Sequence, residues 1–258
     1  MKKIIFSIFA FIFITATSFA ASGFEFILNV PIGMSFGVYD YDFTDLAEYY
    51  DNINNGVMRN AVAKNNGIGF DAGVSAQIGY MFAINTNMGV SVLGELGYSH
   101  DSYSYVSKLN KNFSDTYTFE SLQVGLIPKF NIYNFAIGIG GGVKIPLAGN
   151  LHSKNGDIKS NTKISYNNIS NGYVNKVIPY IKLTFDYSIF FAQNLAINVG
   201  LYLGYDFGLE PTVYSVNNNL LSNNTFPNFG NFLIVEDIAY SSFDIGLQVG
   251  FKFGPSTK

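Results

Sequence analysis

The chain contains 258 residues, of which 48% are hydrophobic and only 13% are charged, about half of the charged fraction of an average globular protein. Such a composition excludes an intrinsically disordered chain, which needs low hydrophobicity and high net charge. The net charge of −3 provides no basic footprint for nucleic acid, and the lack of cysteine excludes disulfides, thiolate catalysis and Cys-ligated metals.

Residues 1–20 have the pattern of a cleaved secretory signal peptide. Two lysines precede the apolar run Ile4–Ala16, and Ser18–Ala20 places small residues before the expected cleavage site. After this segment no apolar run approaches the ~20 residues that a membrane-spanning helix needs, which disfavours a helical membrane bundle. We therefore expect residues 21–258 to be exported as one domain.

The remaining chain alternates apolar residues with small or polar ones along eight segments. A period of two predicts β-strands that have one apolar face. The first segment keeps this alternation for about three times the length of a usual soluble strand of ~5–6 residues. The eight predicted strands are Phe24–Val38, Ile68–Phe82, Met88–Ser99, Leu122–Phe130, Phe135–Leu147, Val177–Tyr187, Leu195–Glu210 and Phe243–Phe253.

The connections between these segments alternate between long and short. The long ones are Tyr39–Gly67, His100–Ser121, Ala148–Lys176 and Pro211–Ser242, and the short ones are Ala83–Asn87, Asn131–Asn134 and Ser188–Asn194. Long loops on one side and tight turns on the other are typical of outer-membrane barrels. We predict an all-β fold, a closed antiparallel eight-stranded transmembrane β-barrel with four long extracellular loops and short periplasmic turns.

A soluble β-sandwich would also alternate, but three features favour the barrel. The strands are long enough for a ~25 Å apolar band, the polar face carries small residues that suit a narrow lumen, and aromatic residues gather at both ends of the apolar face. The turn-side aromatics are Phe24, Phe26, Tyr80, Phe82, Phe130, Phe135, Phe185, Tyr187, Phe251 and Phe253, and the loop-side ones are Phe36, Phe70, Tyr98, Phe119, Tyr205, Phe207 and Phe243.

Eleven ionisable residues within the predicted strands all fall on the parity opposite the apolar set. They are Glu25, Asp71, Glu95, Lys129, Lys144, Lys182, Asp186, Asp206, Glu210, Asp244 and Lys252. A lysine or arginine facing lipid near the midplane costs about 2–4 kcal/mol, which explains this placement. We expect a structural ion-pair network in the lumen; a catalytic carboxylate pair is the alternative. Glu120 does not fit the parity, so we predict a bulge or strand end near Glu120–Ser121.

With these features, the chain resembles the small eight-stranded outer-membrane β-barrel proteins of the OmpA-transmembrane, OmpX and Opa type. The last strand, Asp244–Phe253, is similar to the C-terminal signal through which such barrels reach the barrel-assembly machinery. It departs from the usual pattern by a short tail, Gly254–Lys258. The resemblance implies insertion into outer-membrane lipid of the bacterial cell and assembly by that machinery.

Three other motifs resemble sequences that carry chemistry. Gly138–Lys144 lacks the Gly-Lys-Ser/Thr ending of a phosphate loop, so inward-facing small residues explain its glycines better. His100 and Ser102 echo the His-x-Ser of outer-membrane lipid A deacylases, but a nucleophile needs a base within reach and a third orienting group. A metal site needs three or four convergent ligands, and the two distant histidines, His100 and His152, with scattered loop acids do not indicate one.

The long loops are where binding is expected, because they are exposed segments on a rigid scaffold. Asp45–Ile53 is predicted to form a short helix capped by Thr44, with Leu46, Tyr49 and Tyr50 on one side. The fourth loop holds apolar residues that serve either packing over the barrel mouth or adhesion. These are Val213, Leu220, Leu221, Phe226, Phe229 and Phe232.

The sequence therefore predicts a bacterial outer-membrane barrel with a structural or surface-interaction role, similar to an adhesin or surface antigen. We expect a monomer that is not an enzyme, that binds no cofactor, metal or nucleic acid, and that meets a host or surface ligand through its loops. A narrow pore for small solutes is the first alternative, and a membrane-embedded lipid hydrolase is the second.

Overall fold

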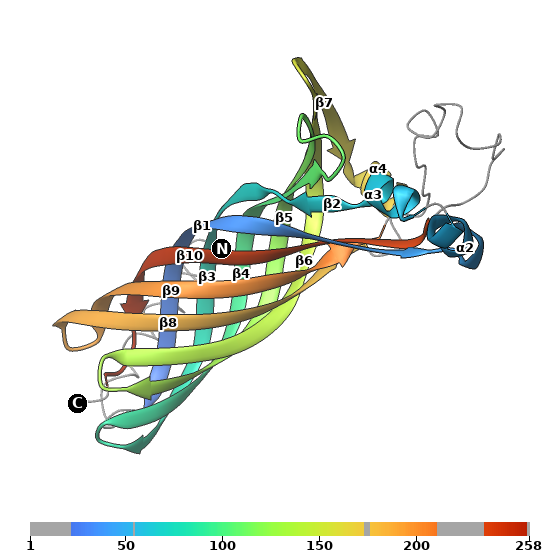
Figure 1. The fold of residues 1–258 in the computed structure, drawn as a ribbon. Helices are drawn as coiled ribbons and strands as arrows, with labels where there is room; N and C mark the ends of the chain where they lie inside the picture. Colours follow the sequence, from blue (N-terminus) through green and yellow to red (C-terminus); the bar gives the residue numbers. More distant parts are fainter. Residues whose placement is uncertain (1–21, 54, 173–175, 211–234, 257–258) are drawn as a thin grey trace.

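The computed structural model describes residues 22–53, 55–172, 176–210 and 235–256. Eight long strands make up the body of the molecule, and each contains or closely matches one predicted segment (Figure 1). They are β1 (Gly23–Phe43), β3 (Ile68–Asn85), β4 (Met88–Ser107), β5 (Phe113–Ile132), β6 (Phe135–Asn155), β8 (Ile178–Ala192), β9 (Leu195–Leu209) and β10 (Val235–Phe253). The alternation in the sequence thus located all eight strands.

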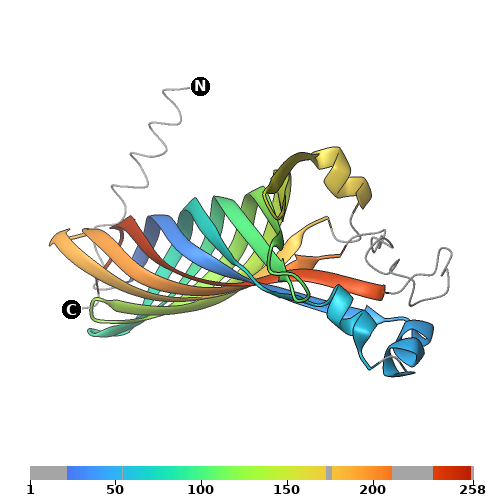
Figure 2. The ribbon, with the colours of Figure 1, turned by 45° about the horizontal axis from the view of Figure 1, so that its top comes forward.

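The eight strands form a closed antiparallel ring. The hydrogen-bonded order is β1-β3-β4-β5-β6-β8-β9-β10, and β10 pairs with β1 to close it. Figure 2 shows the resulting tube of tilted strands. Two-residue turns join β3 to β4, β5 to β6 and β8 to β9 at one end, and all longer connections lie at the other. The predicted barrel with alternating connection lengths is confirmed.

The outer wall of the barrel is a belt of exposed apolar side chains. Val30, Val199 and Leu247 are 46%, 40% and 59% exposed, although each is a large hydrophobic residue. Such a surface on a closed barrel faces lipid, since exposed apolar patches of this extent are rare on soluble monomers. Aromatic residues exposed at the loop end of the belt are Phe70, Tyr98, Phe207 and Phe243, and those at the turn end are Tyr80, Phe82, Phe130, Phe135, Phe185, Tyr187 and Phe251.

The prediction for one loop-side aromatic residue, Phe119, is wrong, because this residue does not lie on the apolar outer face. The register between β5 and β6 shifts at Glu120/Ser121, as the sequence suggested, but the extra residue is Leu147 of β6. The alternation of inward and outward side chains along β5 therefore continues unbroken past Glu120. Glu120 stays on the outer wall, and Phe119 points inward and is only 2% exposed. Because the extra residue is in β6, the bulge changes which way the side chains of β6 point and leaves Phe119 of β5 facing inward.

Several strands are longer than the membrane requires. β4 has 20 residues, which at ~3.3 Å per residue is roughly 66 Å, whereas about 9–11 tilted residues cross the bilayer. The surplus lies beyond Tyr98 at the loop end, where β7 (Ile158–Ser165) pairs with β6 and α4 (Tyr166–Gly172) follows (Figure 1). We call residues 100–120 and 148–172 the head.

A second extension leaves the barrel on β1 and β10. It carries α2 (Asp45–Ile53), α3 (Val57–Val62) and β2 (Lys64–Asn66), which pairs with β4. The predicted helix is confirmed with its cap, because the Thr44 hydroxyl accepts a hydrogen bond from the Ala47 N–H at 3.3 Å. Leu46 and Tyr49 of this helix are exposed, and Ala47 and Asp51 are its buried residues.

No helix in the described part of the chain is long and apolar enough to cross a membrane. The predicted signal peptide and the six apolar residues of the fourth loop lie outside the described residues.

Candidate functional site in the lumen and the head

The lumen contains buried ion pairs between different strands. Three of them are Lys252–Glu25 at 2.6 Å, Lys129–Asp186 at 2.8 Å and Lys182–Glu95 at 3.2 Å. Their side chains are at most 9% exposed. A buried charge without a partner costs several kcal/mol, so each pair ties its two strands together. Lys252 and Glu25 lie on the neighbouring strands β10 and β1, whereas the other two pairs join strands that are not hydrogen-bonded to each other.

A fourth lysine joins two carboxylates nearer the loop end. Lys144 Nζ lies 2.7 Å from Asp101 Oδ1 and 2.6 Å from Asp206 Oδ2. The Tyr103 hydroxyl donates to the same Asp206 oxygen at 2.8 Å. Asp101 was not among the predicted lumen residues, because the third strand was expected to end at Ser99. Extending the same alternation by two residues would have found it.

Ten of the eleven predicted charges lie inside the barrel, and Glu210 is the exception. It follows the last residue of β9 and is partly exposed. Asp71 and Asp244 are buried without being in one of the ion pairs above. Asp71 accepts a hydrogen bond from the Ser102 N–H at 3.0 Å, and Asp244 accepts one from the Ser242 hydroxyl at 2.9 Å.

Uncharged polar side chains complete this network, and charge alone could not predict them. Glu95 accepts hydrogen bonds from Gln77 (3.1 Å), Gln123 (2.5 Å) and the Tyr180 hydroxyl (2.8 Å) in addition to its lysine. The signal in the sequence that could have identified them is their place at the inward-facing positions of the alternating strands. Others that are buried in the lumen are Asn29, Ser91, Asn131, Thr184, Asn198 and Gln248.

Tyrosines fill the space above the inward glycines. A Cβ at Gly33 would lie 2.3 Å from the Tyr202 hydroxyl, and one at Gly125 would lie 2.2 Å from the Tyr180 hydroxyl. These two positions need glycine because a Cβ would also lie 2.6 Å from the Ile245 carbonyl oxygen or 2.8 Å from the Gly141 carbonyl oxygen, and backbone atoms cannot move aside as a side chain can. The cavity between Asp71, Tyr180 and Tyr202 has a volume of about 50 Å³, room for roughly four waters. It is far too small for a solute path.

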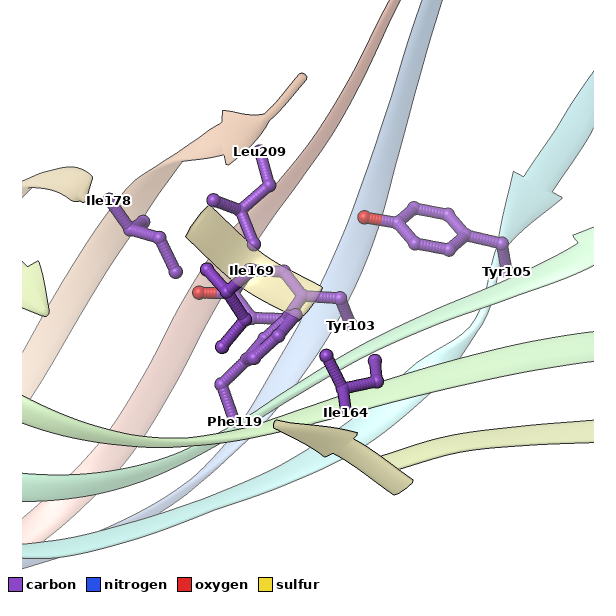
Figure 3. Packing of buried hydrophobic residues seen from close by; sticks show 7 residues of the cluster. All are labelled: Tyr103, Tyr105, Phe119, Ile164, Ile169, Ile178 and Leu209. Atoms are coloured by element: carbon purple, nitrogen blue, oxygen red, sulfur yellow. The ribbon is translucent and has the colours of Figure 1, made fainter. Parts of the chain in front are cut away.

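An apolar cluster closes the mouth of the barrel at the loop end. Tyr103 and Phe119 meet edge to face with ring centroids 5.9 Å apart. Ile169 of α4 packs onto them and is fully buried, so this helix covers the opening (Figure 3). We call the cluster the plug; its residues are Tyr103, Tyr105, Phe119, Ile164, Ile169, Ile178 and Leu209.

Tyrosines and one lysine join the plug to the second extension. Lys64 Nζ lies 2.9 Å from Asp115 Oδ2 and 5.5 Å from the centre of the Tyr39 ring. Burial and the neighbouring Tyr240 raise the pKa of the Tyr39 hydroxyl well above its usual value. The Tyr105 hydroxyl donates to the Ser241 carbonyl oxygen at 2.9 Å. These contacts fix the head against β1 and β10.

His100 of the His-x-Ser pair lies on the outer wall beside Tyr98. His100 Nδ1 is 2.7 Å from Glu120 Oε1, and the Tyr98 hydroxyl donates to the other oxygen of the same carboxylate. Glu120 is therefore in the position of the third, orienting group that a serine–histidine pair needs for nucleophilic chemistry. Ser102, however, is buried, and its hydroxyl donates to the Phe70 carbonyl oxygen at 2.7 Å. The serine is thus engaged with the backbone of β3.

The glycine-rich segment and the histidines build no further site. Gly138–Lys144 is a continuous part of β6 and ends at a lysine inside the barrel, so it forms no phosphate-binding loop. His152 is exposed on the head, far along β6 from the outer wall that carries His100. Among the residues that the structure describes, no group of three or more His, Asp or Glu side chains could hold a metal ion.

A closed eight-stranded barrel with an apolar belt outside and ion pairs inside defines an integral β-barrel protein of the bacterial outer membrane. This barrel is of the small type, in which side chains fill the lumen.

Several solved structures have a similar chain course. Neisserial surface protein A has 10% identity and a TM-score of 0.38 over 88% of this chain and 96% of that chain. The attachment invasion locus protein Ail of Yersinia pestis has 10% identity and a TM-score of 0.32 over 88% and 98%. The outer membrane protease OmpT of Escherichia coli has 9% identity and a TM-score of 0.40 over 89% and 96%. No protein-family model matches the chain, and no curated protein matches it.

Proposed function

We propose that this protein is a surface-interaction barrel, similar in role to an adhesin, whose membrane part is a rigid scaffold for the head. The main support is the combination of a filled, plugged lumen with strands that continue far beyond the apolar belt. A barrel that only anchors itself in the membrane has no use for such long hairpins. Binding sites on rigid scaffolds are commonly carried by projecting segments of this kind.

The filled lumen argues against the narrow pore. Charged pairs occupy it at several levels, the cavity between Asp71, Tyr180 and Tyr202 has a volume of only about 50 Å³, and the plug lies at the loop end. We propose that the ten buried charges have a structural role, because each described pair joins different strands. We also propose that the chain loses residues 1–20, assembles through its last strand as a monomer, and exposes the head to the outside.

A shortened head tests this function. Asn150 and Lys163 are direct partners in the β6–β7 hairpin, so residues 151–162 can be replaced by a two-residue Asn-Gly turn. A non-adherent bacterium that displays the full chain should bind to epithelial cell monolayers more than one displaying the shortened chain. The control replaces the opposite turn, Tyr133–Asn134, with Asn-Gly and should bind like the full chain.

Equal outer-membrane levels of the three chains are checked by the mobility difference between heated and unheated samples. If the full chain gives no more cell binding than the empty host, the proposed function is wrong. If the shortened chain binds as well as the full chain, the head is not the binding part.

A second candidate function, a lipid hydrolase, is favoured by one contact. Glu120 orients the His100 imidazole, and Ser102 follows on the same face of β4. The hydroxyl of Ser102 would have to leave the Phe70 carbonyl oxygen to reach the imidazole. A lipid A deacylation assay decides: activity that disappears in both Ser102→Ala and His100→Gln establishes the hydrolase, and no activity in the parent chain eliminates it.

A further inference from the structure

The sheet of the head has two unlike faces. Alternation along β5, β6 and β7 directs Phe119, Leu151 and Ile164 toward the plug. The opposite face presents a row of hydroxyl, amide and basic side chains, because Thr116 lies beside His152, and His152 beside Asn161. We call this second face the outer face of the head; its residues are Ser114, Thr116, Asn150, His152, Lys154, Lys159, Asn161 and Lys163.

The outer face of the head gathers positive charge. Lys154, Lys159 and Lys163 are all exposed, and Lys154 and Lys159 are direct cross-strand partners. Like charges directly opposite each other destabilise a β-hairpin, so stability does not explain this pair. A pair of like charges that lowers hairpin stability is expected where function requires it.

The neighbouring acids do not neutralise this charge. Asp115 points to the other face, where it binds Lys64 and accepts a hydrogen bond from the Ser153 hydroxyl at 2.8 Å. Glu120 lies at the base of the head and is engaged with His100. Asp157 lies in the turn between β6 and β7, forms no ion pair with a lysine that the structure describes, and is outnumbered by the three lysines of the outer face.

A second hairpin adds to the same charge. The Gly156 N–H donates to the Asn112 carbonyl oxygen at 3.1 Å, which holds the β6–β7 turn against the β4–β5 loop. That loop carries the exposed residues Lys108 and Lys111. In contrast, exposed acids gather on β1 and α2, which lie apart from β7 in both ribbon views (Figures 1 and 2). They are Asp40, Asp42, Asp45 and Glu48.

The basic tip lies well above the membrane. Leu147 is the last exposed apolar residue of β6 before the head, and Lys154 follows seven residues later, roughly 23 Å along the strand, which is about 16–19 Å of height at the tilt of ~35–45° that barrel strands have. Electrostatic screening at physiological salt acts over ~8 Å, so phosphates at the lipid headgroup level are too distant to attract this tip. The partner that fits must carry its negative charge beyond the membrane surface.

We propose that the outer face of the head binds an anionic polysaccharide, with its lysines on sulfate or phosphate groups and its hydroxyl and amide side chains on sugar hydroxyls. The proposal rests on the surface-interaction function and names its ligand class. A flat, polar sheet face with three aligned lysines matches an extended, repeating polyanion better than a compact ligand. Because the phosphates of the protein's own membrane lie too far below the tip, we assign this polysaccharide to another surface, and lipopolysaccharide of the protein's own membrane is the alternative that the test must exclude.

The test measures binding of size-defined dextran sulfate to the refolded protein in nanodiscs, with uncharged dextran as the reference ligand. The variant Lys154→Gln/Lys159→Gln should bind about ten- to thirtyfold more weakly, since each lysine near an anionic surface contributes roughly a fivefold factor. Lys154→Arg/Lys159→Arg keeps both charges and should bind like the parent. Arg59→Gln/Lys176→Gln removes two exposed charges outside the head and should change binding less than twofold.

Equal loss in the two glutamine pairs, or equal binding of both dextrans, overturns the proposal. Vesicles with phosphorylated or dephosphorylated lipopolysaccharide as competitors separate the sources: competition by the phosphorylated form alone assigns the site to the protein's own envelope, and lack of competition assigns it to another surface. If the full chain raises cell binding but does not bind dextran sulfate, the proposed surface-interaction function stands and the polysaccharide proposal is wrong.

Discussion

Removing one partner of the Lys129–Asp186 pair is expected to destabilise the barrel strongly. Both side chains are at most 1% exposed, with 2.8 Å between Nζ and Oδ2. In Lys129→Met the carboxylate keeps hydrogen bonds from Gln248 at 2.5 Å and Asn198 at 3.3 Å. We therefore expect the low end of the range for a broken buried pair, about 3 kcal/mol. Urea unfolding of the protein in lipid vesicles should show a midpoint lower by roughly 1–3 M.

The double variant Lys129→Met/Asp186→Leu should recover to within about 1 kcal/mol of the parent, because no buried charge is left unpaired. The exposed Lys159→Met serves as the control and should change the free energy of unfolding by less than about 0.5 kcal/mol. A Lys129→Met protein as stable as the parent would refute the view that the lumen pairs hold the strands together.

Three further predictions concern the wall, the plug and the topology. Val199→Lys should lower the free energy of unfolding in bilayers by about 2–4 kcal/mol, whereas Ser160→Lys on the exposed β7 should be nearly neutral; equal stability of the two would reverse the facing. Ile169→Ala should destabilise by about 2–4 kcal/mol and speed amide exchange in α4, and unchanged exchange would show that the plug does not depend on this residue. Protease added to intact cells should cut at Gly156, and cleavage only after outer-membrane permeabilisation would invert the topology.

The barrel could be predicted from the sequence because lipid and lumen impose opposite requirements on alternate residues. Val199 and Leu201 must be apolar and Lys182 must face inward, so the period of two persists along every strand. Turn lengths then fixed the connectivity. Ten of the eleven selected charges are buried in the lumen for the same reason, whereas Glu210 lies past the end of β9, where this constraint ceases.

The head could not be predicted in the same way. Beyond the membrane, alternating side chains face either the plug or the solvent. The solvent-facing positions hold residue types, such as those of Thr116 and Asn161, that are also common in loops. The strand ends were therefore placed too early, at Ser99 and Leu147. The side of Phe119 depended on which strand carried the bulge, and only the register between β5 and β6 reveals that.

Single-channel recording of the refolded protein in planar bilayers tests the central claim most directly. The account predicts a silent bilayer, since interstrand ion pairs cross the lumen, Tyr180 and Tyr202 lie against inward glycines, and the plug covers the mouth. Stable conductance steps of the size seen with general porins would contradict it and make the pore the leading function.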